Sequence, residues 1–233
     1  MPAWQVVCDF DGTIALDEVT DGLLARFADP IWAAIETDWR EGRIDARTCL
    51  TRQVALIEAD SFDLDRYLDE VPVDKAFPRF VSDLDRRGIA LVVASDGLDR
   101  AVHRILDRLG LGRLPVLSNR FAPAGNNRWR VGFPYAREHC RAGHGVCKCA
   151  AASAGASRRT LLIGDGRSDF CLASNAADLV FAKGALATFS RARELACVPI
   201  TGFAEARRLL PLLAPWPATL STEASREERR VHA

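Results

Sequence analysis

The 233-residue sequence has neither an excess of one charge nor a long hydrophobic segment. Lys and Arg number 31, as do Asp and Glu, so the chain has no formal net charge at pH 7. A balanced chain has no overall attraction to nucleic acids or anionic membranes, and we expect it to bind neither. No apolar run approaches the roughly 20 residues that are needed to cross a bilayer.

The sequence also lacks an internal repeat and the features of a signal peptide. Its first ten residues, MPAWQVVCDF, contain no basic segment ahead of the apolar stretch. Four of the seven cysteines lie in apolar surroundings that are typical of small core residues in a reducing compartment. These four are Cys8, Cys49, Cys171 and Cys197. We therefore expect a cytoplasmic protein.

What the chain does contain is a globular composition, with 48% hydrophobic and 27% charged residues. Four short apolar runs that end at turn residues predict β-strands buried on both faces. They cover residues 4–10, 89–94, 160–163 and 179–182. Helical patterns lie between them, at residues 77–87, 98–109, 148–154, 168–176 and 186–195. This alternation predicts an α/β fold with a doubly wound parallel sheet.

Residues 18–75 have apolar side chains at helical spacing and no convincing strand, which predicts an all-helical insertion that caps the site. Trp32 and Trp39 share one helical face, and we expect them to pack inside this cap, with contact to a substrate as the alternative. Residues 119–147 are typical of a strand-loop excursion. The predicted units are a core of residues 1–17 and 76–214, a cap of residues 18–75 and a disordered tail of residues 215–233.

Acidic side chains follow three of the predicted strands. Asp9 and Asp11 end the first strand, Asp96 follows the second and Asp165 follows the third. One such Asp is explained by turn chemistry alone. Because ligands of open parallel sheets bind beyond the carboxyl ends of the strands, acids from three strands converge on one place. The sequence therefore predicts a functional site at this edge.

The residues at this edge fit phosphoryl transfer. Asp9 is the predicted nucleophile, which forms an aspartyl-phosphate, and Asp11 is the predicted general acid and base. Carboxylates suit a hard divalent cation, and we expect Mg²⁺. The predicted metal ligands are Asp9, Asp11, Asp165 and Asp169, the last of which has the alternative role of holding Lys148. The predicted phosphate contacts are Gly12, Ser95, Asp96 and Lys148.

Each of these signals is weak by itself. An isolated Asp-x-Asp pair is usually a turn, Ser95 alone suits a helix cap, and Lys148 alone suits a solvated surface. Their order along the chain, each at the strand end or helix start that its role requires, makes the combination specific.

These segments resemble the four motifs of the haloacid-dehalogenase superfamily of aspartate-nucleophile phosphotransferases. DFDGT, at residues 9–13, is similar to the first motif, Ser95 to the second, Lys148 to the third and GDGRSD, at residues 164–169, to the fourth. The resemblance extends over residues 4–212 and implies a Rossmann-like sheet, Mg²⁺ dependence and, usually, phosphatase activity. The helical insertion resembles the type-one cap of the phosphoserine-phosphatase-like branch.

Within this branch the sequence is most similar to the MtnX-like phosphatases, a group that includes an enzyme of methionine salvage. The stretches that carry this similarity are DFDGTI, WREGRIDARTCLTRQVALIEA, VVASDGLD, CKCAA and LVFAKGALATF. The resemblance implies a small phosphorylated metabolite as substrate.

Two cap residues bear on the choice of substrate. In phosphoserine phosphatases a glutamate follows the first motif, and an arginine of the next cap helix binds the substrate carboxylate. The alignment places Glu18 at the first position and Gln53, rather than Arg52, at the second. A neutral amide cannot make the charge-assisted, bidentate bond that a carboxylate requires. We therefore predict a neutral, polyhydroxylated or keto sugar-like phosphate, with phosphoserine as the alternative.

Two other functions share these residues. One is a phosphotransferase or phosphomutase that passes the group to an acceptor other than water, and the other is a catalytically silent binding protein that has kept the fold. The presence of every expected catalytic residue argues against the silent protein. The sequence leaves open whether the chain is a monomer or a homodimer.

A cluster of His139, Cys140, His144, Cys147 and Cys149 surrounds Lys148. Its C-x6-C-x-C spacing is not a usual structural-zinc pattern, so we expect reduced thiols, with zinc as the second interpretation. A disulfide such as Cys140–Cys147 is disfavoured in a reducing cytosol.

Overall fold

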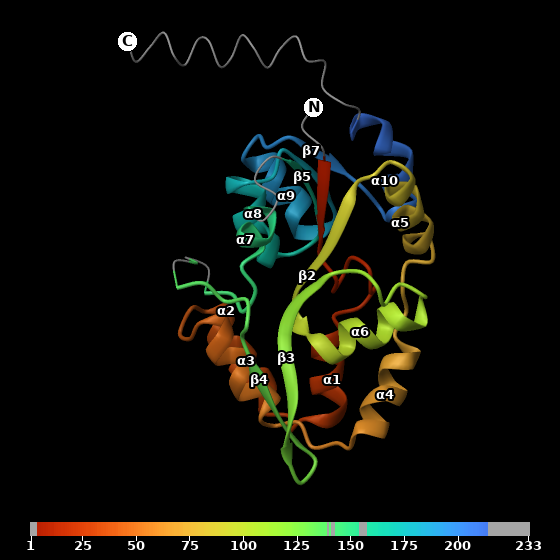
Figure 1. Ribbon diagram of the computed structural model, residues 1–233. Helices are drawn as coiled ribbons and strands as arrows, with labels where there is room; N and C mark the ends of the chain where they lie inside the picture. Colours follow the sequence, from red (N-terminus) through yellow and green to blue (C-terminus); the bar gives the residue numbers. More distant parts are fainter. Residues whose placement is uncertain (1–3, 139, 141–142, 154–157, 214–233) are drawn as a thin grey trace.

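The computed structural model describes residues 4–138, 140, 143–153 and 158–213, so the predicted tail of residues 215–233 lies outside the described residues. A seven-stranded sheet has the order β4-β3-β2-β1-β5-β6-β7 (Figure 1). The strands are β1 (Trp4–Cys8), β2 (Ala90–Leu98), β3 (Val116–Gly125), β4 (Arg128–Gly132), β5 (Arg159–Gly164), β6 (Leu179–Ala182) and β7 (Cys197–Pro199). All neighbours are parallel except β3 and β4. The predicted doubly wound sheet is confirmed.

Helices cover both faces of this sheet (Figure 1). One group contains α5 (Phe77–Arg86), α6 (Asp99–Arg108) and α10 (Phe203–Leu209), and the other contains α7 (Lys148–Ser153), α8 (Phe170–Asn175) and α9 (Gly184–Ala192). The side chains of β1 alternate between two apolar clusters, with Val6 and Cys8 in one and Val7 in the other. This explains why the strand is buried at every position and apolar at all but Gln5, whose amide donates hydrogen bonds to Ala152 O and Thr160 Oγ1.

The predicted helical insertion consists of α1 (Val19–Phe27), α2 (Trp32–Arg40), α3 (Ala46–Val54) and α4 (Ser61–Glu70). Two of these helices begin at aspartates that cap them. The Asp45 side chain accepts a hydrogen bond from Thr48 N at 2.7 Å, and the Asp60 side chain accepts one from Asp63 N at 2.8 Å. In Figure 1 the insertion lies beyond the carboxyl ends of β1 and β2.

Two sets of contacts join the insertion to the rest of the chain. On one side, Arg104 of α6 forms two hydrogen bonds with Asp69 of α4, at 2.8 and 2.7 Å. On another side, the tip of the β3–β4 hairpin reaches the segment between α3 and α4. There Trp129 Nε1 donates to Ala59 O at 2.9 Å, and Arg128 pairs with Glu58 at 2.9 Å.

The structure corrects several predicted boundaries. β2 continues through Ser95 to Leu98, with a register shift against β3 after Ala94. The excursion predicted over residues 119–147 begins earlier, as the β3–β4 hairpin, whose two-residue turn places Asn126 and Asn127 at positive φ. Strand β7 and helix α10 were not predicted. The helix predicted to end at residue 195 ends at Ala192, since Glu194 has a φ of 54°.

Among the described residues, no helix has the length and apolar character that a membrane crossing requires.

Candidate active site

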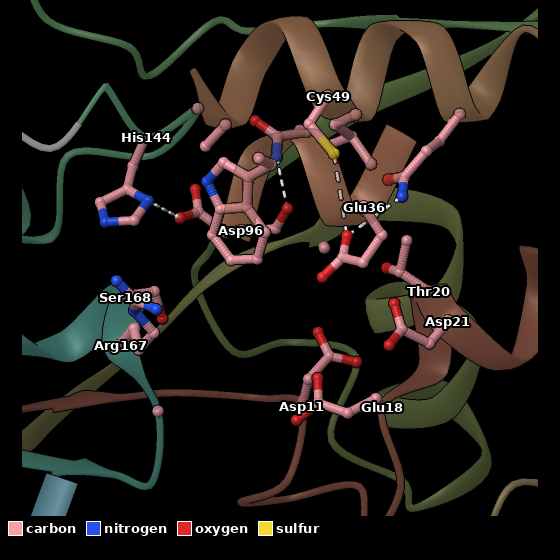
Figure 2. Close-up of a pocket in the computed structure, with 18 of the residues that line it drawn as sticks. Asp11, Glu18, Thr20, Asp21, Glu36, Cys49, Asp96, His144, Arg167 and Ser168 are labelled. Carbon is pink, nitrogen blue, oxygen red and sulfur yellow. Dashed lines mark hydrogen bonds and ion pairs between the residues drawn. The ribbon is translucent and has the colours of Figure 1, made fainter. Parts of the chain in front are cut away.

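A cavity of about 540 Å³ lies between the carboxyl ends of the central strands and the helical insertion. Figure 2 shows His144, Arg167 and Ser168 on one side of it and Glu18, Thr20 and Asp21 on the opposite side. Six of the predicted site residues line this cavity: Asp9, Asp11, Glu18, Gln53, Asp96 and Asp165. The parallel register of β1 with β2 and β5 explains this convergence, because their carboxyl ends lie side by side.

Asp9 directly follows β1 and is only 5% exposed. Its Oδ1 accepts a hydrogen bond from Phe10 N at 2.8 Å and pairs with the Lys148 ammonium group at 2.8 Å. Its Oδ2 accepts a long hydrogen bond from Ser168 Oγ, at 3.5 Å. Two donors therefore hold one carboxylate oxygen, and the second is the atom best placed to react with a ligand.

Lys148, the first residue of α7, is 3% exposed and lies between two carboxylates. Its Nζ is 2.8 Å from Asp9 Oδ1 and 2.7 Å from Asp169 Oδ1. Burial by itself lowers the pKa of Lys148, but the charges of Asp169 and Asp9 outweigh it and hold the pKa above its usual value. The site thus contains a permanently charged ammonium group in contact with the predicted nucleophile.

The carboxylate of Asp11 is fixed by two donors, one at the start of α1 and one in β2. Val19 N donates to Asp11 Oδ1 at 2.9 Å, and Ser95 Oγ donates to Asp11 Oδ2 at 3.2 Å. Burial and then the charge of Asp9 raise the pKa of Asp11 to about 7. A carboxyl group with a pKa near neutrality is suited to exchange protons in both directions.

Three aspartates form a candidate metal site. Asp9, Asp165 and Asp169 each offer a carboxylate oxygen, and these three oxygens lie within 4.8 Å of one another. Among the described residues, no other group of three or more potential metal ligands is this close together. Burial and then the charge of Asp9 raise the pKa of Asp165, which indicates too little positive charge for so many carboxylates. A hard divalent cation fits both the oxygen donors and this deficit. Asp11, the fourth predicted ligand, lies outside the group.

Gly12 allows Asp165 to approach the first motif. The residue has a φ of +63°, and a Cβ atom on it would lie 2.4 Å from Asp165 Oδ2. Thr13 Oγ1 donates to Asp165 Oδ1 at 2.9 Å, and Lys183 Nζ donates to Gly12 O at 2.7 Å. Glycine is therefore required here for both the backbone conformation and the available space.

Asp96 uses both carboxylate oxygens within the protein. Oδ1 accepts from Val146 N at 2.8 Å, and Oδ2 pairs with His144 Nδ1 at 2.8 Å. Contact between Asp96 and a phosphate therefore stays a prediction. The Asn119 side chain donates to Asp96 O at 2.6 Å, and its own buried oxygen has no hydrogen-bond partner within the described part of the chain.

The insertion supplies the opposite wall of the cavity. Gln53 Nε2 donates to Glu36 Oε2 at 3.1 Å. The Cys49 thiol donates to the same oxygen at 3.7 Å, and Figure 2 shows the Cys49 and Glu36 side chains pointing toward each other. Trp39 lines the cavity as well. The expectation that Trp39 packs inside the cap is therefore wrong, and the alternative, contact with a substrate, stays a prediction. Trp32 packs against the main apolar cluster, as predicted.

Five residues at the site were missed from the sequence: Thr13, Glu36, His144, Ser168 and Lys183. Ser168 lies inside the GDGRSD segment, and its Oγ is 2.9 Å from Lys148 Nζ. The amino-acid composition could have pointed to Lys183. The chain has only three lysines but 28 arginines, and two of the three lysines lie at this site. His144 was singled out only as a possible zinc ligand, and Glu36 had no signal.

Among the residues that the structure describes, the members of the cysteine cluster do not form a group of metal ligands. His139 lies outside the described residues, and His144 pairs with Asp96. Cys149 instead contacts Cys171 of α8, with 3.5 Å between the sulfur atoms. Zinc stays a prediction without support from the described geometry, in which all seven cysteines are free thiols.

Comparison with known proteins identifies the class. The model of the haloacid dehalogenase-like hydrolase family matches residues 6–174, and the chain belongs to this family. The predicted superfamily and enzyme class, a hydrolase of the haloacid-dehalogenase type, are confirmed.

Individual relatives agree with this membership. A 2-hydroxy-3-keto-5-methylthiopentenyl-1-phosphate phosphatase from Exiguobacterium sp. is 28% identical over 206 residues, covering 85% of this chain and 93% of the relative. A protein of the same name from Microcystis aeruginosa is 28% identical over 89% of this chain and 97% of its own. The predicted similarity to MtnX-like phosphatases is therefore confirmed.

Solved structures resemble the fold. A phosphoserine phosphatase, determined as a phospho-aspartyl intermediate analogue, has a TM-score of 0.66 at 19% identity over 89% of this chain and 99% of that chain. The predicted Rossmann-like α/β fold is confirmed by this likeness.

Proposed function

We propose that the protein is a divalent-metal-dependent phosphomonoesterase with Asp9 as nucleophile and Asp11 as general acid and base. One observation carries the proposal. Asp9 lies at the base of a cavity, in contact with Lys148 and in a group with Asp165 and Asp169. The names of the relatives support the same reaction.

The residues of the chain have separate tasks in this mechanism. Asp9 Oδ2, which among the described residues accepts only the long hydrogen bond from Ser168, attacks phosphorus, while Lys148 holds Oδ1 and offsets negative charge. Asp11 gives a proton to the leaving oxygen and later takes one from the attacking water. Asp9, Asp165 and Asp169 would hold the cation, Mg²⁺ in our proposal, which supplies electrostatic stabilisation of the phosphoryl oxygens.

Removal of divalent metal should abolish turnover of an aryl phosphate, and added Mg²⁺ should restore it. The reason is that the three carboxylates repel an anionic substrate when no cation is bound. Mg²⁺ should also raise the melting temperature of the wild type but not of Asp165→Asn, because a ligand that binds only the folded state stabilises it. Full activity in excess EDTA, or an equal thermal shift in the variant, would contradict the assignment.

We further propose a leaving group without a carboxylate, such as a keto- or sugar-like alcohol. Gln53 offers a neutral amide that is already bonded to Glu36, and Arg40 also pairs with Glu36, at 3.0 Å. Glu18, Asp21 and Glu36 line the cavity together with Arg40, so carboxylates outnumber cations on this wall and disfavour an anionic leaving group. The methylthiopentenyl phosphate in the names of the relatives fits such a class.

Phosphoserine should therefore be a poor substrate. We expect its kcat/KM to be at least about 10-fold below that of small keto- and sugar phosphates, which corresponds to about 1.4 kcal/mol. The double variant Gln53→Arg, Glu36→Gln supplies a cation and removes an anion. It should therefore bring the kcat/KM for phosphoserine closer to the kcat/KM for keto- and sugar phosphates. A wild-type preference for phosphoserine would refute the proposal. Analysis of the phosphate-bearing products would distinguish hydrolysis from transfer to another acceptor.

The division of the chain into a core of residues 1–17 and 76–214 and a cap of residues 18–75 is part of the proposal. It is supported by the all-helical character of Val19–Glu70 and by the position of α1 to α3 around the cavity. A cytoplasmic location and a monomer or homodimer remain expectations from the sequence.

A further inference from the structure

Four cysteines gather beside the proposed active site as two pairs. Cys149 of α7 donates its thiol hydrogen to Cys171 of α8, with 3.5 Å between the sulfur atoms. Burial and then the neighbouring Cys140 thiol raise the pKa of the Cys147 thiol, so these two side chains lie near each other. Cys140 and Cys147 precede α7, whereas Cys171 comes from an element more than 20 residues further along the chain.

This pairing favours dithiol chemistry over a tetrathiolate metal site. Among the described residues, Asp9, Asp165 and Asp169 are the only three potential metal ligands whose ligand atoms all lie within 4.8 Å of one another. It follows that no three of the four sulfur atoms are that close together. The Cys149 and Cys171 sulfurs, in contrast, are already in contact and need to approach by about 1.5 Å to reach the length of a disulfide bond.

The position of this pair connects it to the active site. Cys149 directly follows Lys148, and Cys171 lies two residues after Asp169. Helices α7 and α8 pack against each other, and the ion pair between Lys148 and Asp169, at 2.7 Å, joins the same two segments. A covalent bond between the sulfurs therefore acts on the two segments that place the ammonium group against Asp9.

We propose that Cys149 and Cys171 form a reversible disulfide that switches off the active site. In the reaction, one cysteine thiolate attacks a low-molecular-weight disulfide such as glutathione disulfide and releases one glutathione thiol. The other cysteine then attacks the mixed disulfide and releases the second. Two protein thiols are oxidised, one glutathione disulfide is reduced to two glutathione molecules, and the two protons leave with them.

The local environment indicates which sulfur reacts first, and how fast. Asn175 Nδ2 donates a hydrogen bond to Cys171 Sγ at 3.6 Å, as does the Cys149 thiol, so Cys171 is suited to the first attack. Burial and then the hydrogen bond to Cys171 raise the pKa of Cys149 to about 12. Because thiolates carry out the exchange, we expect oxidation to take hours rather than seconds.

The test uses the full chain, incubated with glutathione disulfide, blocked with iodoacetamide, denatured and digested with trypsin. Cleavage after Lys148 places Cys149 in a peptide of residues 149–158, apart from Cys147, and Cys171 in residues 168–183. We expect these two peptides to be joined after oxidation and separate after treatment with dithiothreitol. Failure to detect this link, or a link from Cys149 only to Cys147, would overturn the proposal.

Phosphatase activity provides the second measurement. This measurement rests on the proposed phosphatase function, whereas detection of the linked peptides does not. A displacement on the scale of 1 Å at the catalytic groups lowers rates by about 100-fold, so we expect a loss of about 10- to 100-fold that dithiothreitol reverses. Cys149→Ser and Cys171→Ser should keep their activity under oxidation, whereas the control Cys197→Ser should lose it like the wild type. Inactivation of Cys149→Ser to the wild-type extent, or full activity of the linked wild type, would refute the switch.

Discussion

Replacement of Asp9 by asparagine should lower the turnover of any phosphate ester by roughly 10⁴-fold or more, as expected when a covalent nucleophile is lost. Asparagine keeps the size of the side chain and an oxygen that accepts hydrogen bonds, but it lacks the negative charge needed for attack on phosphorus. The measurement is kcat for an aryl phosphate at saturating Mg²⁺. Asp9→Ala, which cannot revert to aspartate by deamidation, should behave in the same way.

The stability of Asp9→Asn distinguishes this result from misfolding. The charge of Asp9 contributes to the raised pKa values of Asp11 and Asp165, so its removal relieves repulsion among the remaining carboxylates. We therefore expect a melting temperature equal to or above that of the wild type in the absence of metal. Asp17→Asn, which removes an exposed carboxylate nearby, is the matched control and should retain its activity. An active Asp9→Asn protein would end the proposed mechanism.

Replacement of Lys148 by methionine should reduce both activity and stability. Methionine fills a similar volume but leaves Asp9 and Asp169 buried without their shared cation. Loss of one partner of a buried ion pair costs about 3 to 5 kcal/mol of unfolding free energy. We also expect kcat to fall by about 10²- to 10³-fold, because one preorganised charge that stabilises the transferring group is lost.

The stability of Lys148→Met should depend on pH in a defined direction. In the wild type, the raised pKa of Lys148 keeps this cation present across the neutral range. Burial and then the charge of Asp9 raise the pKa of Asp169 well above its usual value, and Lys148 opposes this rise. Without Lys148, the folded state favours protonated Asp169 more strongly, so the variant is most stable at low pH and loses stability as pH rises. Chemical denaturation at several pH values measures this trend. Lys75→Met, at an exposed lysine, should leave stability and rate unchanged, and an equal loss in this control would contradict the argument.

The location of the site could be predicted from the sequence because its acids follow strands. In a parallel sheet the carboxyl ends of neighbouring strands share one edge, so Asp9, Asp96 and Asp165 had to meet once the strands were recognised. Lys148 was predicted only in combination with these acids, and it lies where the combination requires.

Other parts of the site could not be predicted because they depend on tertiary contacts. Lys183 reaches a carbonyl group 171 residues earlier in the chain, and Glu36 meets Gln53 only because α2 packs against α3. Trp39 has the same helical spacing whether it faces the cap interior or the cavity. The sequence did not reveal β3 because Pro123 and the exposed residues at the end of this strand break the apolar pattern seen in the central strands.

The β3–β4 hairpin has a consequence for how ligands reach the cavity. The helical insertion is joined to the rest of the chain by its two covalent connections and by side-chain contacts on two sides. Trp129 and Arg128 of the hairpin bind Ala59 and Glu58, and Arg104 of α6 binds Asp69 of α4. A swing of all four helices away from the sheet would have to break these contacts or carry the hairpin along. Entry and exit are therefore easier through local shifts of α1 to α3, with α4 and the hairpin acting as a fixed frame.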